Sequence, residues 1–118
     1  MPYLSRKISM NWQATATEKD LRVEILSRLQ QHSRVAWSHR MYTGLLGGHG
    51  NAKRYTIGFA GCSDIIGQLT NGQLLAIEVK TLKGNPTKDQ QDFLDLVNRN
   101  GGIGFVARCA ADVNRNIP

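Results

Sequence analysis

The chain has 118 residues, of which 41% are hydrophobic, and a formal net charge of +6. These totals fit one folded domain, 1–118, and exclude a chain that is disordered throughout. The positive charge favours a polyanionic partner, and nucleic acid is a better candidate than an acidic membrane because the basic residues are spread along the chain. No apolar run is long enough for a membrane span or a signal peptide, so we expect a cytoplasmic protein.

The N-terminal residues 1–15 carry basic and aromatic side chains without a clear period. They are interpreted either as an arm, which could pair with a second copy, or as a partly disordered terminus. The next element is a helix, predicted to start after the N-cap Thr17 and to end near Gln31. Its apolar stripe contains Leu21, Ile25 and Leu29.

Glu18 falls on the apolar stripe of this first helix, whereas Glu24 falls on the opposite face. Two interpretations of Glu18 stay open: a first-turn acid favoured by the helix dipole, or a functional carboxylate. A cluster of charges later in the chain favours the functional role. Glu24 is interpreted as a solvated surface charge.

A short strand is predicted over 35–40, and another over 55–60. The glycine-rich stretch 44–54 between them is predicted to be a loop. Lys53 and Arg54 are candidate DNA contacts, since a basic loop near a cleft suits phosphate binding. Arg40, at the end of the first strand, is a further candidate. The P-loop pattern is absent. The histidines of this region, His39 and His49, are weak candidates for metal binding or acid–base chemistry.

Residues 61–80 read as two apolar strands joined by a tight turn at Asn71-Gly72. Asp64 opens the first strand, and Glu78 and Lys80 close the second on a shared face. Burial of unpaired charges costs several kcal/mol, so a purely structural role would not explain three of them here. We therefore expect the two carboxylates to hold a divalent cation, with the ammonium beside it.

The length of this turn decides whether the charges meet. A two-residue loop would place Asp64 opposite Val79, which faces away from Glu78. A three-residue loop over 70–72, with a left-handed glycine at its end, places Asp64 opposite Glu78. A bulge at Gly67 would have the same effect. The sequence therefore predicts an odd loop or a bulge.

After a connection that carries Lys83, a further DNA-contact candidate, Thr87 and Gln90 form a capping-box pattern that starts a second helix. The helix ends at Asn100, and a buried strand over 103–108 is predicted to run parallel to a neighbour. Residues 109–118 either form a last helical turn or trail off. This order of elements predicts an α/β fold with a mixed β-sheet flanked by helices.

The residue types suit cleavage of a phosphodiester. Mg²⁺ prefers hard oxygen ligands, which Asp64, Glu78 and the Val79 carbonyl could provide. Lys80 could orient the attacking water or stabilise developing negative charge. Cys62, beside Asp64, is interpreted as a small buried filler rather than as a nucleophile. The two cysteines lack CxxC spacing, which argues against a zinc site. The role of Gln90 is open between helix cap and site residue, and local sequence slightly favours the cap.

These motifs resemble the PD-(D/E)xK nuclease superfamily and, more closely, the VRR-NUC (virus-type replication-repair nuclease) domain. The segments that carry the resemblance are Gly61-Cys62-Ser63-Asp64, Glu78-Val79-Lys80, and Gln90 followed by Phe93. The wider match adds Glu18, Arg40 with Gly44, and Gly101-Gly102. The superfamily's proline before the aspartate is replaced here by Ser63, as is common in this subfamily.

The resemblance implies a restriction-endonuclease-like core and cleavage that depends on Mg²⁺ or Mn²⁺. By position, Asp64 and Glu78 would bind the metal together with the Val79 carbonyl. Lys80 would be the catalytic lysine and Glu18 the helix acid of the site. The resemblance also moves the interpretation of Gln90 from the cap towards the site.

Standalone domains of this kind resemble phage and prophage Holliday-junction resolvases. This implies a homodimer that acts on branched, four-way DNA in a bacterial or phage-infected cell, with a role in DNA repair. The alternatives are a flap or duplex nuclease of lower selectivity, and a non-catalytic DNA-binding module on the same fold.

Overall fold

The computed structural model describes residues 15–42, 44–47 and 54–118. A four-stranded sheet has the order β1-β4-β5-β6, in which β6 is parallel to β5 and the other pairs are antiparallel. The elements are α2 (Glu18–Gln30), β1 (Val35–Arg40), β2 (Gly44–Gly47), β3 (Arg54–Ile57), β4 (Ile65–Leu69), β5 (Leu74–Val79), α3 (Lys88–Arg99), β6 (Ile103–Ala107) and α4 (Ala111–Asn116). The mixed α/β sheet and the parallel last strand are confirmed, and the arrangement is compatible with a restriction-endonuclease-like core.

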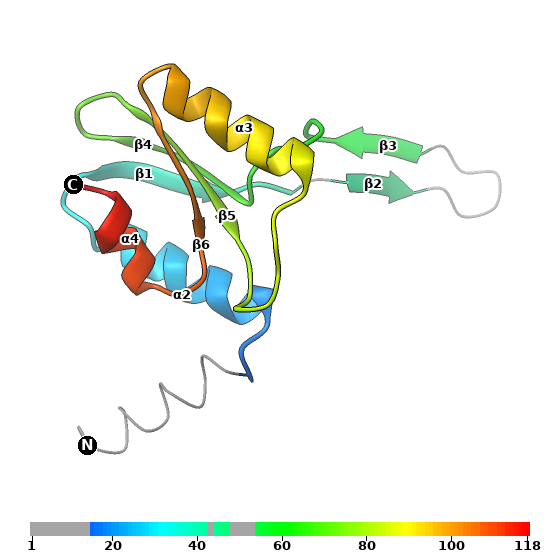
Figure 1. Cartoon of the computed structure of the whole chain (residues 1–118), viewed down its shortest axis with the longest axis horizontal. Coiled ribbons are helices and arrows are strands. Elements are labelled where there is room, and N and C mark those ends of the chain that lie inside the picture. The colour runs from blue at the N-terminus through cyan, green and yellow to red at the C-terminus, as the bar shows by residue number, and fades with distance from the viewer. Residues whose placement is uncertain (1–14, 43, 48–53) are drawn as a thin grey trace.

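Helices cover both faces of the sheet (Figure 1). The helices α2 and α4 lie on one face, where Ile25, Ile77 and Val113 belong to the main core. The helix α3 lies on the other face, where Leu94 and Val97 pack on Ala76. Because β-strand side chains alternate, Ala76 and Glu78 share the α3 face of the sheet. No helix of the described residues is long and apolar enough to cross a membrane.

The two long helices begin where the capping patterns place them. Thr17 accepts a hydrogen bond from the backbone N–H of Asp20, whose carboxylate accepts in turn from the Thr17 N–H. Thr87 and Gln90 form the same reciprocal pair at the start of α3. These bonds satisfy N–H groups that have no partner inside the helix. The last residues form α4, which settles the open alternative for 109–118.

The turn between β4 and β5 has three residues, as the odd-loop prediction requires. Ile65 pairs with Ile77 and Gln68 with Leu74, and the Leu69 N–H donates to the Gln73 carbonyl (2.9 Å). Residues 70–72 form the loop, and its glycine has a φ of +95°. Only a residue without Cβ adopts this conformation freely. The prediction of an odd loop is therefore confirmed.

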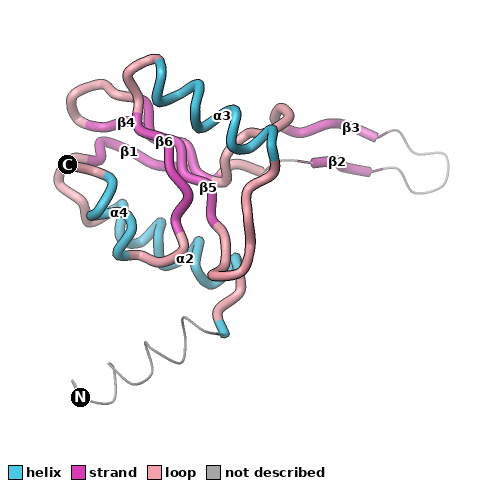
Figure 2. Tube along the Cα trace, in the orientation of Figure 1, coloured by secondary structure: helices cyan, strands magenta, loops and turns pink. Residues whose placement is uncertain are grey.

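The glycine-rich stretch differs from its prediction as a loop. Gly44 pairs with Ile57 and Gly47 with Arg54, so β2 and β3 form a two-stranded antiparallel ribbon that extends away from the main sheet (Figure 2). The two glycines stand at the ends of β2, and the interstrand hydrogen bonds outweigh their weak strand preference. The predicted strand over 55–60 is shorter, because Gly58 has a φ of +77°. Residues 1–14, 43 and 48–53, which include His49 and Lys53, lie outside the described residues.

Candidate active site

Asp64 and Glu78 lie at the end of the β4–β5 hairpin away from its loop. Continuing the observed pairing by one residue beyond Ile65 and Ile77 places the two carboxylates opposite one another on the α3 face. Asp64 Oδ2 accepts a hydrogen bond of 2.8 Å from the backbone N–H of Val79, which fixes its side chain. The three-residue loop therefore brings the two acids together, because a register shift of one residue would turn one of them to the other face.

Glu78 is almost completely buried, at 2% exposure. Its Oε2 atom has no hydrogen-bond partner among the described residues. Burial, followed by hydrogen bonding to Asp64 and the charge of Asp64, raises the pKa of Glu78 to about 8. An isolated carboxylate in this position costs free energy. A cation with a preference for oxygen ligands would remove that cost, so the orphaned oxygen fits a metal site.

Lys80 connects the carboxylates to the first helix. Its Nζ atom lies 3.8 Å from Glu78 Oε1 and 3.9 Å from Glu18 Oε1. The lysine side chain is 13% exposed, whereas that of Glu18 is 45% exposed. The Lys80 N–H extends the parallel ladder by donating to the Ala107 carbonyl (3.1 Å). Four charged groups thus come close together from α2, the start of β4 and the end of β5. Glu18 lies in the first turn of its helix and also contacts the lysine.

Gln90 completes the capping box of α3, and its Oε1 atom accepts from the Thr87 N–H at 2.9 Å. This contact agrees with the cap interpretation, and a role for Gln90 in the site stays a prediction. The start of α3 nevertheless lies close to the segment that carries Asp64. A Cβ atom on Gly61 would come within 2.2 Å of the Asp89 carbonyl oxygen, so only glycine permits this approach.

Cys62 and Ser63, the two residues before Asp64, are both buried. Cys62 is buried, and its thiol donates to the Ser63 carbonyl at 3.6 Å. Burial, then the charges of Glu78 and Asp64, raises the pKa of the Cys62 thiol. A nucleophilic cysteine needs the opposite shift. The Ser63 hydroxyl donates to the Ile65 carbonyl (2.9 Å), so both residues pack and hold the strand start.

The structure places two of the four DNA-contact candidates. The guanidinium of Arg40 lies 4.3 Å from the centre of the Tyr42 ring, and its Nε atom is buried without a partner among the described residues. Lys83 is exposed in the turn that follows Lys80. The side chain of Arg54 is not described, and Lys53 lies outside the described residues. Arg40 and Lys83 remain candidates for phosphate contacts.

Sequence reasoning missed Arg108, which holds the turn after Lys80. Its Nη1 atom donates to the Thr81 carbonyl at 2.6 Å and also to the carbonyl of Gly84. The Gly84 N–H closes the same turn on Thr81 (3.2 Å). The available sequence signal was a basic residue directly after a buried strand. No local pattern could identify its partner Gly84, which lies 24 residues earlier.

Among the described residues, no group of three or more His, Cys, Asp or Glu side chains is placed to share a metal ion. The site offers two carboxylates, and Mg²⁺ is usually bound in proteins through one or two of them, with waters and substrate phosphate completing its shell. His39 is exposed, and its Nδ1 atom lies 2.7 Å from the Arg40 carbonyl oxygen. It therefore adds nothing to the carboxylate pair.

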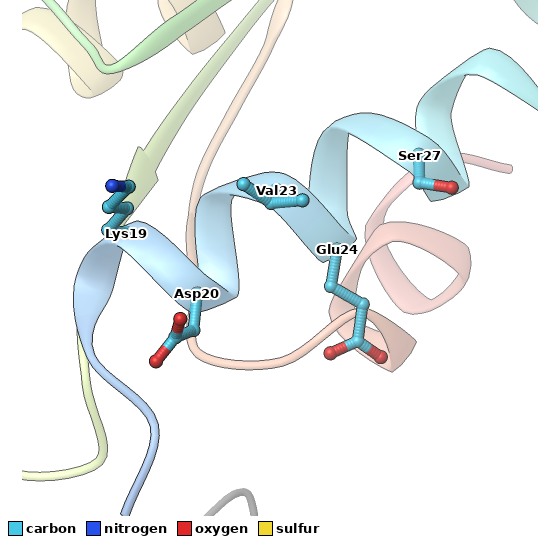
Figure 3. A pocket seen from close by; sticks show the side chains of 5 residues that line it. All are labelled: Lys19, Asp20, Val23, Glu24 and Ser27. Carbon is cyan, nitrogen blue, oxygen red and sulfur yellow. The ribbon is translucent and has the colours of Figure 1, made fainter.

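A separate hollow of about 490 Å³ lies along the outer face of α2 (Figure 3). Side chains of one helix line it, and it contains none of the predicted site residues. The lining residues are Lys19, Asp20, Val23, Glu24 and Ser27. Glu24 is exposed there, in agreement with its interpretation as a solvated charge. The chemistry of the site therefore lies at the strand ends and outside this hollow.

A family model for the VRR-NUC domain matches residues 5–111. The chain belongs to the VRR-NUC family. Membership makes it a nuclease domain of the virus-type replication-repair family, with DNA as the substrate. The match spans every element from α2 to β6, so the converging Glu18, Asp64, Glu78 and Lys80 all lie within the VRR-NUC domain. Searches of curated proteins and of solved structures found no match to this VRR-NUC chain.

Proposed function

We propose that this VRR-NUC domain is a metal-dependent, structure-selective DNA endonuclease that cleaves four-way junctions as a homodimer. The observation that supports it is the pairing of the half-buried Asp64 with the buried Glu78, which has the Lys80 ammonium 3.8 Å from it. A buried acid with an unsatisfied oxygen lowers the stability of the fold. A catalytic role would explain why such a residue is present here.

Asp64 and Glu78, together with the Val79 carbonyl, would hold Mg²⁺, for which Mn²⁺ is a chemically similar substitute. When bound, the cation would supply Lewis acidity, which polarises a phosphate and lowers the pKa of water. The fit rests on the donor set and on the orphaned Oε2 atom of Glu78. Asp64 is already held in place by the Val79 N–H, so the cost of ordering its side chain is met by folding.

Lys80 is the residue placed to act on the phosphate and the attacking water. Its ammonium, mostly removed from solvent, would stabilise negative charge that develops on the phosphate oxygens. It donates hydrogen bonds in its charged form and needs no proton loss for this role. Glu18, 3.9 Å away, would orient the ammonium from the other side. Gln90 would place its amide at the edge of the same site.

The net charge of +6 supports binding to the DNA backbone, with Arg40, Lys53, Arg54 and Lys83 as proposed phosphate contacts. A single domain of this kind offers a small surface for a four-way junction. Two copies related by a two-fold axis would place two sites on a substrate of matching symmetry. Residues 1–15 are the proposed contribution of the arm to such a dimer.

To test the proposed function, wild-type protein is incubated with labelled four-way, flap and linear duplex DNA in Mg²⁺, Mn²⁺ or EDTA. We expect the junction to be cleaved with metal, and this cleavage to disappear in Asp64→Ala and Lys80→Ala. The matched controls Asp95→Ala and Lys88→Ala remove exposed charges from α3 and should cleave normally. Equal cleavage of flap and duplex DNA would support the less selective nuclease instead.

Binding without cleavage under every metal would support the non-catalytic module. Light scattering tests the dimer on the same samples. A strictly monomeric protein that still cleaves junctions would contradict the proposed assembly and leave the proposed chemistry standing.

A further inference from the structure

The aromatic ring of Trp37 is exposed on the sheet face that α3 covers over β5 and β6. Its relative exposure is 48%, which is high for a tryptophan in a strand. Trp37 lies in β1, the edge strand, and pairs with Gln68 of β4. The helix α3 packs on β5 and β6, so it leaves the β1 end of this face open.

The position of the ring is held by hydrogen bonds. Trp37 Nε1 donates to Gln68 Oε1 at 3.0 Å, and Gln68 Nε2 donates to the Gly72 carbonyl at 3.2 Å. The polar group of the indole is therefore satisfied within the protein. What the exposed part of the side chain still offers to a ligand is its apolar aromatic surface.

The same face leads to the candidate active site. Gln68, Ile66 and Asp64 alternate with residues of the main core, so all three share the face on which Trp37 lies. Gln68 and Asp64 are four positions apart, which corresponds to about 14 Å along the strand. The rise per nucleotide of B-form DNA is about 3.4 Å, so Trp37 lies within about four nucleotides of the carboxylate pair.

We propose that Trp37 is a stacking platform for an unpaired DNA base close to the scissile phosphate. The proposal rests on the proposed nuclease function and deepens it, because it names the substrate feature that the site selects. Base stacking needs an exposed base face, which an intact duplex hides and a branch point or single strand provides. The positively charged chain supplies the attraction for the backbone, and the ring supplies the preference for unpaired bases.

The test measures binding without turnover, in EDTA, with Asp64→Asn as the background. Trp12→Phe leaves Trp37 as the only tryptophan. We expect a short oligothymidylate to quench its fluorescence and a duplex of equal length to quench it much less. Binding of a fluorescein-labelled oligothymidylate is then followed by anisotropy. Trp37→Leu should raise Kd by between about 5- and 150-fold, and Trp37→Phe by less.

The matched control is Val23→Ala, which removes an exposed apolar side chain from the outer face of α2 and should leave Kd unchanged (Figure 3). Circular dichroism and thermal melting show that each variant is folded. Wild-type affinity of Trp37→Leu for the single strand would overturn the proposal. Fluorescence that changes with protein concentration alone, together with dimer formation in light scattering, would also overturn it, since a second copy would then cover the ring.

Failure of the proposed function is a separate result. In that case the wild-type protein would cleave none of the DNA substrates with Mg²⁺ or Mn²⁺. The binding measurements use neither metal nor turnover, so they stand or fall on Trp37 alone.

Discussion

The Asp64 carboxylate accepts a hydrogen bond of 2.8 Å from the backbone N–H of Val79, across the end of the β4–β5 hairpin. This bond joins the residue that opens one strand to the residue that lies between Glu78 and Lys80. The acid is thereby held beside both groups before any ligand binds. Its position depends on the backbone of β5, so its charge and its geometry can be tested separately.

Asp64→Asn removes the charge and keeps a carbonyl oxygen for the Val79 N–H. We expect a melting temperature close to that of the wild type and a loss of DNA cleavage of about 100-fold or more, because the cation ligand is lost. Gel assays of cleavage and thermal melting check this. Asp64→Asn protein that cleaves at the wild-type rate would show that the carboxylate is not part of the active site.

Because of Glu78, we expect the free energy of unfolding to fall as the pH rises. Burial, then hydrogen bonding to Asp64 and the Asp64 charge, raises its pKa from 4.5 to about 8, so between these values the unfolded chain loses the proton and the folded chain keeps it. The contribution of Glu78 to the free energy of unfolding is therefore fully present below pH 4.5 and is lost as the pH rises to about 8. The free energy of unfolding of the wild type should decrease relative to that of Glu78→Gln over this range.

Chemical denaturation at several pH values measures the difference between these two proteins. Subtraction removes the titration of groups that do not interact with Glu78. Mg²⁺ should restore stability to the wild type at high pH, because it binds the ionised carboxylate, and should do little for Glu78→Gln. A difference that stays constant across this pH range would contradict the prediction.

Glu18 and Glu24 allow a matched comparison on one helix. Glu18 lies 3.9 Å from the Lys80 ammonium, whereas Glu24 is exposed on the outer face of α2. Glu18→Gln should lower cleavage by about 10-fold by releasing Lys80 from one of its two partners. Glu24→Gln should cleave like the wild type, and both should keep their stability within about 0.5 kcal/mol. Equal cleavage by the two variants would assign Glu18 to the helix dipole alone.

Gly61 and Gly72 both have positive φ, at +80° and +95°, but differ in their surroundings. Apart from its chain neighbours, no atom of the described residues lies within 4 Å of a Cβ at Gly72, so Gly72→Ala should cost about 1–2 kcal/mol of backbone strain. A Cβ at Gly61 would meet the Asp89 carbonyl oxygen at 2.2 Å. Gly61→Ala should therefore lose more, about 3 kcal/mol or more, since backbone must move.

Urea denaturation of the two glycine variants gives the comparison directly. We also expect Gly61→Ala to lose cleavage under conditions in which it is folded, because the start of α3 shifts away from the Asp64 segment. Similar losses of stability in both variants would show that α3 does not approach Gly61 closely.

Local patterns were enough for the helix starts and for the hairpin. The capping boxes at Thr17 and Thr87 depend on residues three positions apart, and the facing of Asp64 and Glu78 follows from a strand period of two and a loop of three. Local patterns failed for β2 and β3. There Gly44 pairs with Ile57 in an antiparallel ribbon, and the glycine content of the stretch hides this pairing because glycine has a weak strand preference.

The sequence by itself determined the identity of the charged residues, their faces on the strands and the α/β order of elements, because these depend on nearest neighbours. Only the tertiary structure decided the environment of these residues. Packing of the sheet buries Glu78 and raises its pKa, and the approach of α2 to the end of β5 brings Glu18 to Lys80. Arg108 meets Thr81 for the same reason: the contact exists only after β6 has docked beside β5.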